Sequence, residues 1–183
     1  MGKVIAIVGQ IASGKSTLAK YMEEHGFERI VTYTTRSPRD GEIDSVDYHF
    51  LRGLEEFTDK AEAGFFAEHT GYTAKFGFVR YGTSKESLET PGGVNKAIVL
   101  NPEGVIQLKE AGYDIFTVYL DMPQEVLMRR ALQRGDTPSE IGRRIADDTR
   151  IFRDMESRNI VDLHITNSML FPNQIAEMIQ SAL

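Results

Sequence analysis

Residues 4–16 read Val4-Ile5-Ala6-Ile7-Val8-Gly9-Gln10-Ile11-Ala12-Ser13-Gly14-Lys15-Ser16, and this stretch decides the fold of the chain. Its first five residues form a continuous apolar run, which is typical of a buried strand. The last eight fit the pattern G-x-x-x-x-G-K-[ST], and residues 15–24 have the apolar spacing of a helix. A strand, a glycine-rich loop and a helix in this order form the context in which that pattern binds phosphate.

The residue types in this loop have chemical reasons. Glycines let backbone N–H groups approach phosphate oxygens without a Cβ in the way, and the helix start adds its positive dipole end. Lys15 is expected to reach the β- and γ-phosphates of a nucleoside triphosphate, and the Ser16 hydroxyl to bind Mg²⁺. The alternative is a structural turn with an incidental lysine, but motif, position and flanking elements agree on a triphosphate site. Its expected residues are Gly9, Ala12, Ser13, Gly14, Lys15 and Ser16.

Composition limits the classes of protein that remain. The 183 residues suggest one domain with insertions, and 41% apolar residues argue against disorder. The absence of cysteine excludes disulfides and cysteine-ligated metal sites. A net charge of -6 disfavours a nucleic-acid binder. No apolar run is long enough for a membrane span, and the N-terminal run is too short for a signal peptide, so a cytoplasmic location is expected.

Apolar segments alternate between strand and helix patterns along most of the chain. Further strands are expected at 30–31, 97–100, 115–120 and 163–166, and helices at 102–111, 126–134, 143–155 and 172–182. This alternation predicts an α/β fold, a parallel sheet with helices on both faces. Residues 32–85 break the alternation and predict a small mixed insertion, which leaves 1–31 and 86–183 as the core. Asp121 is expected to cap the helix that follows it rather than to bind a metal.

A second anion site is indicated after the strand expected at 30–31. Arg36 and Arg39 stand three residues apart with a proline between them, and their guanidinium groups can fork onto one phosphate. Tyr48 and Tyr81 can add phenolic donors to the same group. A solvated surface loop is the alternative, and the spacing by itself leaves both interpretations open.

Longer motifs resemble those of one enzyme family. Residues 34–50, TTRSPRDGEIDSVDYHF, resemble the guanylate kinase signature T-T-R-x-P-R-x-G-E-x-x-G-x-D-Y-x-F, and residues 81–83 resemble its Y-G-[ST]. Arg134-Gly135 with Arg143-Arg144 resembles the family's lid. The resemblance implies a P-loop NTPase fold that carries a monophosphate-binding insertion and a helical lid over 134–144. It also implies transfer of the ATP γ-phosphoryl group to GMP or dGMP with Mg²⁺, so small nucleotides are the expected partners; the sequence leaves the oligomeric state open.

The resemblance assigns roles to individual residues. Arg36, Arg39, Tyr48 and Tyr81 would hold the acceptor phosphate, and Thr32 and Glu68 would reach guanine. Glu42 and Thr83 would line the acceptor pocket. Asn167 would lie at the adenine edge of the ATP site.

This sequence also departs from the family pattern. Val99 and Asn101 replace an acid-x-Asp pair, so Asn101 is expected to line the acceptor pocket without adding negative charge. The segment between Glu68 and Tyr81 is a few residues longer than is usual. Two other functions follow as alternatives: a related kinase for another nucleoside monophosphate or a sugar phosphate, and a non-catalytic binding module. The intact Lys15 argues against the second.

Arginines crowd around Gly135 in the lid segment. Some of them fit a solvated helix face with i,i+4 ion pairs. Phosphoryl transfer, however, needs positive charge on the moving oxygens and exclusion of water. Arg134 and Arg144 are assigned to that role, with Arg143 as the substitute for Arg144 if the register is shifted by one residue. The expected catalytic residues are Lys15, Arg36, Arg134 and Arg144.

Overall fold

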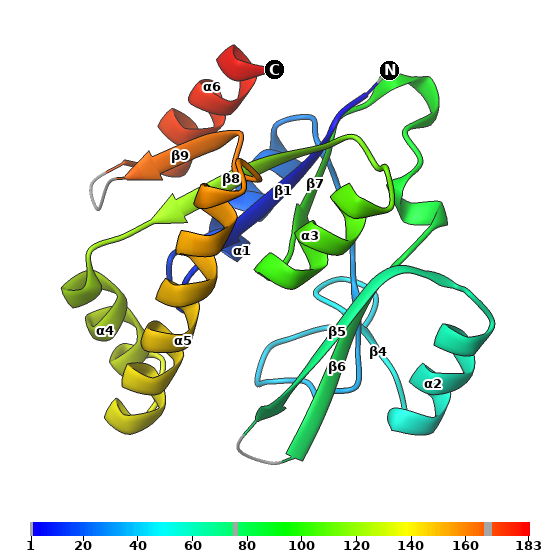
Figure 1. The fold of residues 1–183 in the computed structure, drawn as a ribbon, viewed down its shortest axis with the longest axis horizontal. Coiled ribbons are helices and arrows are strands. Elements are labelled where there is room, and N and C mark those ends of the chain that lie inside the picture. Colours follow the sequence, from blue (N-terminus) through cyan, green and yellow to red (C-terminus); the bar gives the residue numbers. More distant parts are fainter. Residues whose placement is uncertain (1, 75–76, 167–169) are drawn as a thin grey trace.

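The structure of the protein, a computed structural model, describes residues 2–74, 77–166 and 170–183. These residues form two sheets (Figure 1). We call them the core sheet, with strand order β2-β7-β1-β8-β9, and the small sheet, with strand order β4-β3-β6-β5. The α/β architecture predicted from the sequence is confirmed.

The core sheet is parallel throughout its described pairings. Its strands are β2 (Glu28–Arg29), β7 (Lys96–Val99), β1 (Val4–Gly9), β8 (Ile115–Asp121) and β9 (Leu163–Thr166). β1 is central and its first five residues are buried, as the apolar run predicts. Ile5 and Ile7 pack into one hydrophobic cluster, and Val4, Ala6 and Val8 into another. Because strand side chains alternate between faces, β1 joins two cores.

Helices cover both faces of the core sheet. They are α1 (Lys15–Glu24), α3 (Pro102–Glu110), α4 (Gln124–Gln133), α5 (Pro138–Ser157) and α6 (Pro172–Ala182). α1, α4 and α6 contribute to the cluster of Ile5 and Ile7, whereas α3 contributes to the cluster of Val4. Each fully buried Ile or Leu in these clusters stabilises the fold by about 1.5–3 kcal/mol.

Several expectations about helices and strands need correction. The strand expected at 30–31 lies two residues earlier, although the Ile30 N–H still donates to Ala97 O. α5 begins at Pro138, five residues before the expected start, so Arg143 and Arg144 lie within a 20-residue helix and the turn is confined to 134–137. Asp121 does not cap a helix, because the N-cap residue of α4 is Pro123. The Asp121 carboxylate instead pairs with His164 Nε2 at 3.1 Å.

The small sheet lies within residues 33–84. Its strands are β3 (Tyr33–Thr34), β4 (His49–Phe50), β5 (Phe66–Ala74) and β6 (Gly77–Ser84), with α2 (Leu54–Glu62) beside the β5–β6 hairpin. β6 is antiparallel to both of its neighbours, whereas β3 and β4 are parallel. Two 3-10 turns, η1 (Glu86–Leu88) and η2 (Pro91–Gly93), lead back to the core sheet.

α3 fastens the small sheet to the core. The Gln107 side chain accepts a hydrogen bond from the His69 N–H at 3.2 Å and donates to the His69 carbonyl at 3.1 Å. Asn101 donates to the Thr70 hydroxyl at 2.7 Å. α3 and β5 therefore meet through the side-chain amides of Gln107 and Asn101. Figure 1 shows α3 at the side of the core sheet toward the small sheet. In the described part of the chain, no helix has the length and apolar character to cross a membrane.

Candidate functional site

The phosphate loop closes tightly between β1 and α1. Lys15 is the first residue of α1, and its ammonium donates to the carbonyls of Gly9 at 2.7 Å and Gln10 at 2.9 Å. Gly9 has no room for a side chain, since a Cβ would lie 2.5 Å from Ser13 Oγ and 2.8 Å from Leu120 O. Gly14 has a φ of 101°, which favours glycine. The glycines of the motif are therefore required by the shape of the loop.

Positive charge is concentrated at Lys15. Desolvation lowers the pKa of Lys15 to about 8, the carboxylate of Asp148 opposes this, and the charges of Arg144 and Arg134 lower the pKa further. Arg130 also reaches the loop and donates to Ser13 O at 3.5 Å. Cations held this close together are stabilised by a polyanion, so the loop is suited to a triphosphate.

α5 holds the phosphate loop from the side, a contact that the sequence analysis missed. The Asp148 carboxylate accepts the Ile11 N–H at 3.2 Å, and burial raises the pKa of that carboxyl. Gln10 Nε2 donates to the Thr149 hydroxyl at 2.9 Å. Asp148 stands four residues after Arg144, and that i,i+4 spacing was the available signal that both lie on one face of a helix.

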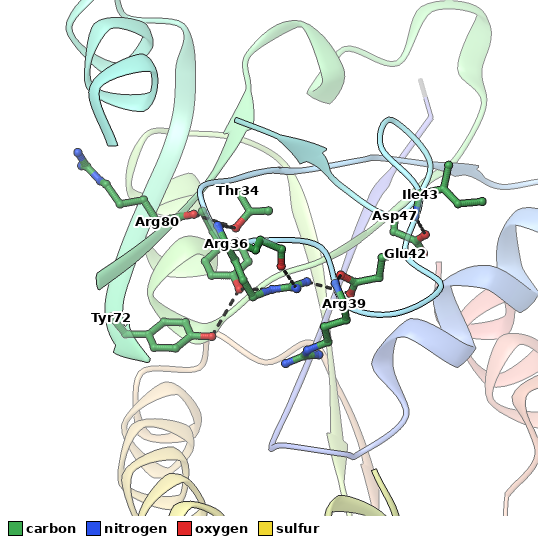
Figure 2. A network of polar contacts seen from close by, with 10 residues as sticks. Thr34, Arg36, Arg39, Glu42, Ile43, Asp47, Tyr72 and Arg80 are labelled. Atoms are coloured by element: carbon green, nitrogen blue, oxygen red, sulfur yellow. Dashed lines mark hydrogen bonds and ion pairs between the residues drawn. The ribbon is translucent and has the colours of Figure 1, made fainter. Parts of the chain in front are cut away.

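A polar network surrounds Arg36 (Figure 2). Arg36 donates from Nη2 to Glu42 at 2.8 Å and from Nε to the Tyr81 hydroxyl at 3.2 Å. The Arg39 N–H donates to the second Glu42 oxygen at 2.7 Å. The Arg36 guanidinium lies 5.3 Å from the centroid of the Tyr48 ring. The structure thus brings together five of the residues expected in the acceptor site, namely Arg36, Arg39, Glu42, Tyr48 and Tyr81.

Thr34 shapes the start of this loop. Its hydroxyl accepts the Arg36 N–H at 3.1 Å and donates to Arg80 O at 3.1 Å, which fixes the chain where it leaves β3. Farther along, the Asp47 carboxylate accepts the Ile43 N–H at 2.8 Å. These local bonds support the arginine loop from both ends, so Arg36 is presented from an ordered turn.

Glu68 occupies a buried position on β5. Only 3% of Glu68 is exposed, and its carboxylate accepts a hydrogen bond from Thr83 at 2.5 Å. Burial raises the pKa of Glu68 to about 7, while the Thr83 bond acts in the opposite direction. Gly104 of α3 allows this packing, because a Cβ there would lie 2.7 Å from Glu68 Oε2. A carboxylate kept in so little water can discriminate strongly between donors and acceptors.

Asn101 has a structural task that its sequence position did not reveal. It caps α3: its side-chain oxygen accepts the Gly104 N–H at 2.8 Å while its nitrogen donates to Thr70. Both ends of the amide are therefore engaged beside Glu68. Thr32 is also buried, and its carbonyl accepts the His49 N–H at 2.9 Å. Asn167 lies outside the described residues.

The three lid arginines differ in their surroundings. Arg134 is held by Asp136 next to it in the turn. Arg143 pairs with Asp147 at 3.7 Å, and 60% of each side chain is exposed. Arg144, like Arg134, acts on Lys15, and it lies 5.9 Å from the centroid of the Tyr72 ring on β5. Of the two neighbouring arginines, Arg144 thus faces both the phosphate loop and the small sheet.

The loop residues fit a metal ion that arrives with phosphates. In the ranges that the structure describes, no group of three or more His, Asp or Glu residues could hold a metal on its own. The exposed hydroxyl of Ser16, in the first turn of α1, is an oxygen ligand of the kind that Mg²⁺ takes. Mg²⁺ usually keeps several waters and uses substrate phosphates, so a single hydroxyl suffices.

Comparisons with known proteins agree with this geometry. The family model described as "Guanylate kinase" matches residues 1–182. The guanylate kinase of Clostridium perfringens strain SM101 is 36% identical over 146 residues, which cover 76% of this chain and 65% of that protein. The guanylate kinase of Sus scrofa is 31% identical over 173 residues, 91% of this chain and 85% of the relative.

A solved structure supports the fold. The crystal structure of guanylate kinase from Anaplasma phagocytophilum matches with a TM-score of 0.73 and 24% identity, and the match covers 98% of this chain and 83% of that one. The chain spans about two thirds of the length of its Clostridium relatives, 65% by alignment. With a family model that covers residues 1–182 and a shared fold, the chain belongs to the guanylate kinase family.

Proposed function

We propose that the protein is an ATP-dependent guanylate kinase, which transfers the ATP γ-phosphoryl group to GMP and releases ADP and GDP. The observation that carries this proposal is the row of side chains on one face of the β5–β6 hairpin. Glu68 and Thr83 pair at one end of the row, and Tyr81, which binds Arg36, lies two residues farther along β6. A base-reading carboxylate and a phosphate-binding group are thus presented together, as a nucleoside monophosphate requires.

The base reading follows from the chemistry of the carboxylate. The guanine edge offers two neighbouring donors, N1–H and N2–H₂, and an ionised carboxylate offers two acceptors. Adenine presents an acceptor at N1, which a carboxylate repels. Because Glu68 is buried, a mismatched partner leaves polar groups unpaired at a high cost in free energy.

The transfer step needs mainly positioning and positive charge. Lys15 binds the β- and γ-phosphates, and Arg36 and Arg39 hold the acceptor phosphate. Arg144 of α5 approaches the phosphoryl group that moves between donor and acceptor. These cations stabilise the charge that spreads over the transferred phosphoryl oxygens. Ser16, together with the substrate phosphates, would hold Mg²⁺, which would supply further charge neutralisation. Closure of the segment 134–144 excludes water and suppresses hydrolysis of ATP.

A panel of acceptors tests the proposal. ADP release at saturating Mg-ATP is measured with GMP, dGMP, AMP, CMP, UMP, dTMP and a set of sugar phosphates. Dominant turnover with GMP or dGMP is the expected result. Turnover with a different acceptor would replace this proposal with a kinase of changed specificity, and binding of ATP without any turnover would point to a non-catalytic module.

Replacing Arg39 by alanine is expected to raise the KM for GMP about tenfold with little change in kcat. Its exposed side chain would contribute a charge-assisted hydrogen bond to the acceptor phosphate, a contact made before and during the reaction. Steady-state kinetics at varied GMP measure the effect. The exposed Arg52, in the segment between β4 and α2, supplies the matched control as Arg52→Ala. An unchanged KM for GMP would remove Arg39 from the acceptor site.

Acid pH is expected to weaken the use of GMP. The pKa of Glu68 is raised to about 7, so the carboxylate is present above that pH and becomes a neutral acid below it. The neutral acid carries a proton toward guanine donors, and kcat/KM for GMP should fall by up to about tenfold per pH unit below 7. The phosphate of GMP also titrates near pH 6. Glu68→Gln, which cannot titrate there, isolates that contribution; an identical pH profile in both proteins would contradict the role of Glu68.

A further inference from the structure

Tyr72 continues the row of side chains that forms the acceptor face of the β5–β6 hairpin. Glu68, Thr70 and Tyr72 alternate along β5, so they lie on one face of the strand. The partners of these residues on β6 are Thr83, Tyr81 and Val79, respectively. Tyr72 is therefore the next position after Thr70, at the end of the row away from Glu68. The hairpin that carries it is the segment that is longer than the family pattern.

On one side, Tyr72 contacts the network around Arg36. Its ring is parallel to that of Tyr81 within 6°, with centroids 5.9 Å apart. The two hydroxyl oxygens are 3.5 Å apart, and the Tyr81 oxygen also accepts from Arg36 Nε. Figure 2 shows the Tyr72 hydroxyl directed toward this network. The Tyr81 oxygen has two lone pairs, so it can accept from both neighbours and still donate its own proton to a phosphate.

On its other side, Tyr72 meets the lid helix. The Arg144 guanidinium carbon lies 5.9 Å from the Tyr72 ring centroid, within the range of a cation–π contact. Among the described residues, Arg144 forms no ion pair with a carboxylate, whereas Arg143 and Arg134 each have one. The face of an aromatic ring orients a guanidinium without neutralising it, and the charge stays available for phosphate.

The chemical state of Tyr72 suits this place. Partial desolvation and the neighbouring Tyr81 raise the pKa of Tyr72 to about 12, although the charges of Arg144 and Arg39 act in the opposite direction. The phenol therefore keeps its proton at neutral pH and remains a hydrogen-bond donor. Tyr72 keeps 39% of its surface exposed, so the ring is accessible to a closing helix.

We propose that Tyr72 is a positioning residue for the transfer step, which seats Arg144 over its ring and orients Tyr81 through its hydroxyl. The inference rests on the proposed function and goes beyond it, since it assigns a residue that joins the lid to the acceptor phosphate site. Arg144 belongs to α5, which also holds the phosphate loop through Asp148. A path of contacts then leads from the donor loop through Arg144 and Tyr72 to Arg36.

A double-mutant cycle on Tyr72 and Arg144 tests the proposal. Tyr72→Leu removes the aromatic ring and should lower kcat about tenfold, because Arg144 loses the surface that orients it. Arg144→Ala should lower kcat about 10²-fold. The double variant should be no slower than Arg144→Ala alone, because the Tyr72 ring has no effect on catalysis once the guanidinium that it orients is absent. Tyr72→Phe keeps the ring, so its kcat should stay within about twofold while its KM for GMP rises a few-fold.

Phe78→Leu is the matched control for the hairpin. Phe78 is 51% exposed, pairs with Thr73 across the hairpin and so lies on the face opposite to Tyr72. Its kinetics should equal those of the wild type. Thermal melting checks each variant, and Tyr72→Thr, which retains strand propensity, replaces Tyr72→Leu if the leucine variant does not fold.

The outcomes separate the inference from the proposed function. Normal GMP turnover by the wild type, together with multiplicative losses in the double variant or an unaffected Tyr72→Leu, would overturn the role of Tyr72 alone. Absence of turnover with every acceptor in the wild type would overturn the proposed function and this inference with it.

Discussion

Replacement of Lys15 by alanine is expected to lower kcat by about 10³-fold, the largest effect of any single change in the phosphate loop. The Lys15 ammonium crosses the loop to the Gly9 and Gln10 carbonyls, and two arginine charges act on it. A triphosphate would draw Lys15 from those carbonyls to its own oxygens, where charge grows in the transition state. ADP release at saturating ATP and GMP measures the loss.

The control variant for the Lys15 prediction changes another lysine on the same helix. Lys20 is exposed one turn and a half farther along α1, and Lys20→Ala removes the same charge from the protein without touching the loop. Its kcat should remain within about twofold of the wild type. If Lys15→Ala and Lys20→Ala gave equal activities, the loop would not be the donor site.

Replacement of Glu68 by glutamine should lower kcat/KM for GMP by about 10³-fold, since two charge-assisted hydrogen bonds to guanine are lost and a donor faces a donor. Glu68 is 3% exposed, so water cannot satisfy the mismatched groups. Turnover with AMP should fall far less, because an amide can pair with the adenine edge. The ratio of kcat/KM for GMP to that for AMP is therefore the decisive quantity.

Glu62→Gln serves as the reference for the loss of one carboxylate in the same region. Glu62 ends α2 and is exposed, so its removal should leave the GMP to AMP ratio unchanged. A Glu68→Gln protein that kept the wild-type ratio would show that another group reads the base. Thermal melting is needed beside the kinetics, since the Thr83 hydroxyl then bonds to a neutral amide in place of a carboxylate.

Local sequence patterns were sufficient for most of the secondary structure. The helices expected at 15–24 and 172–182 have those bounds in the structure, and the strand at 163–166 does also. Their apolar spacing is strong, Gly14 precedes α1 and Pro172 begins α6, and these are local signals. α5 was predicted too short, because its first turn is polar and its start depends on Ile141, which is fully buried against other helices.

The candidate site also combines features that the sequence predicted with features that only the structure shows. The resemblance to guanylate kinases predicted that Arg36, Glu42 and Tyr81 belong to one site, and the structure places them in one network. The resemblance also placed Asn101 in the acceptor pocket, and the structure adds that its amide caps α3 and donates to Thr70. Capping of α3 is a local event, whereas the bond to Thr70 depends on where the small sheet meets the core.

What the sequence by itself determined is the α/β framework and the kind of chemistry to expect on it: a phosphate-loop motif and a second group of arginines and tyrosines. These follow from residue types at fixed short spacings. Only the tertiary structure decided which of Arg143 and Arg144 faces the site, and that Tyr72 and Asp148 stand beside Arg144 and Lys15. The rotation of a packed helix about its axis and the strand register of a hairpin decide which side chains meet. Both depend on contacts between distant parts of the chain.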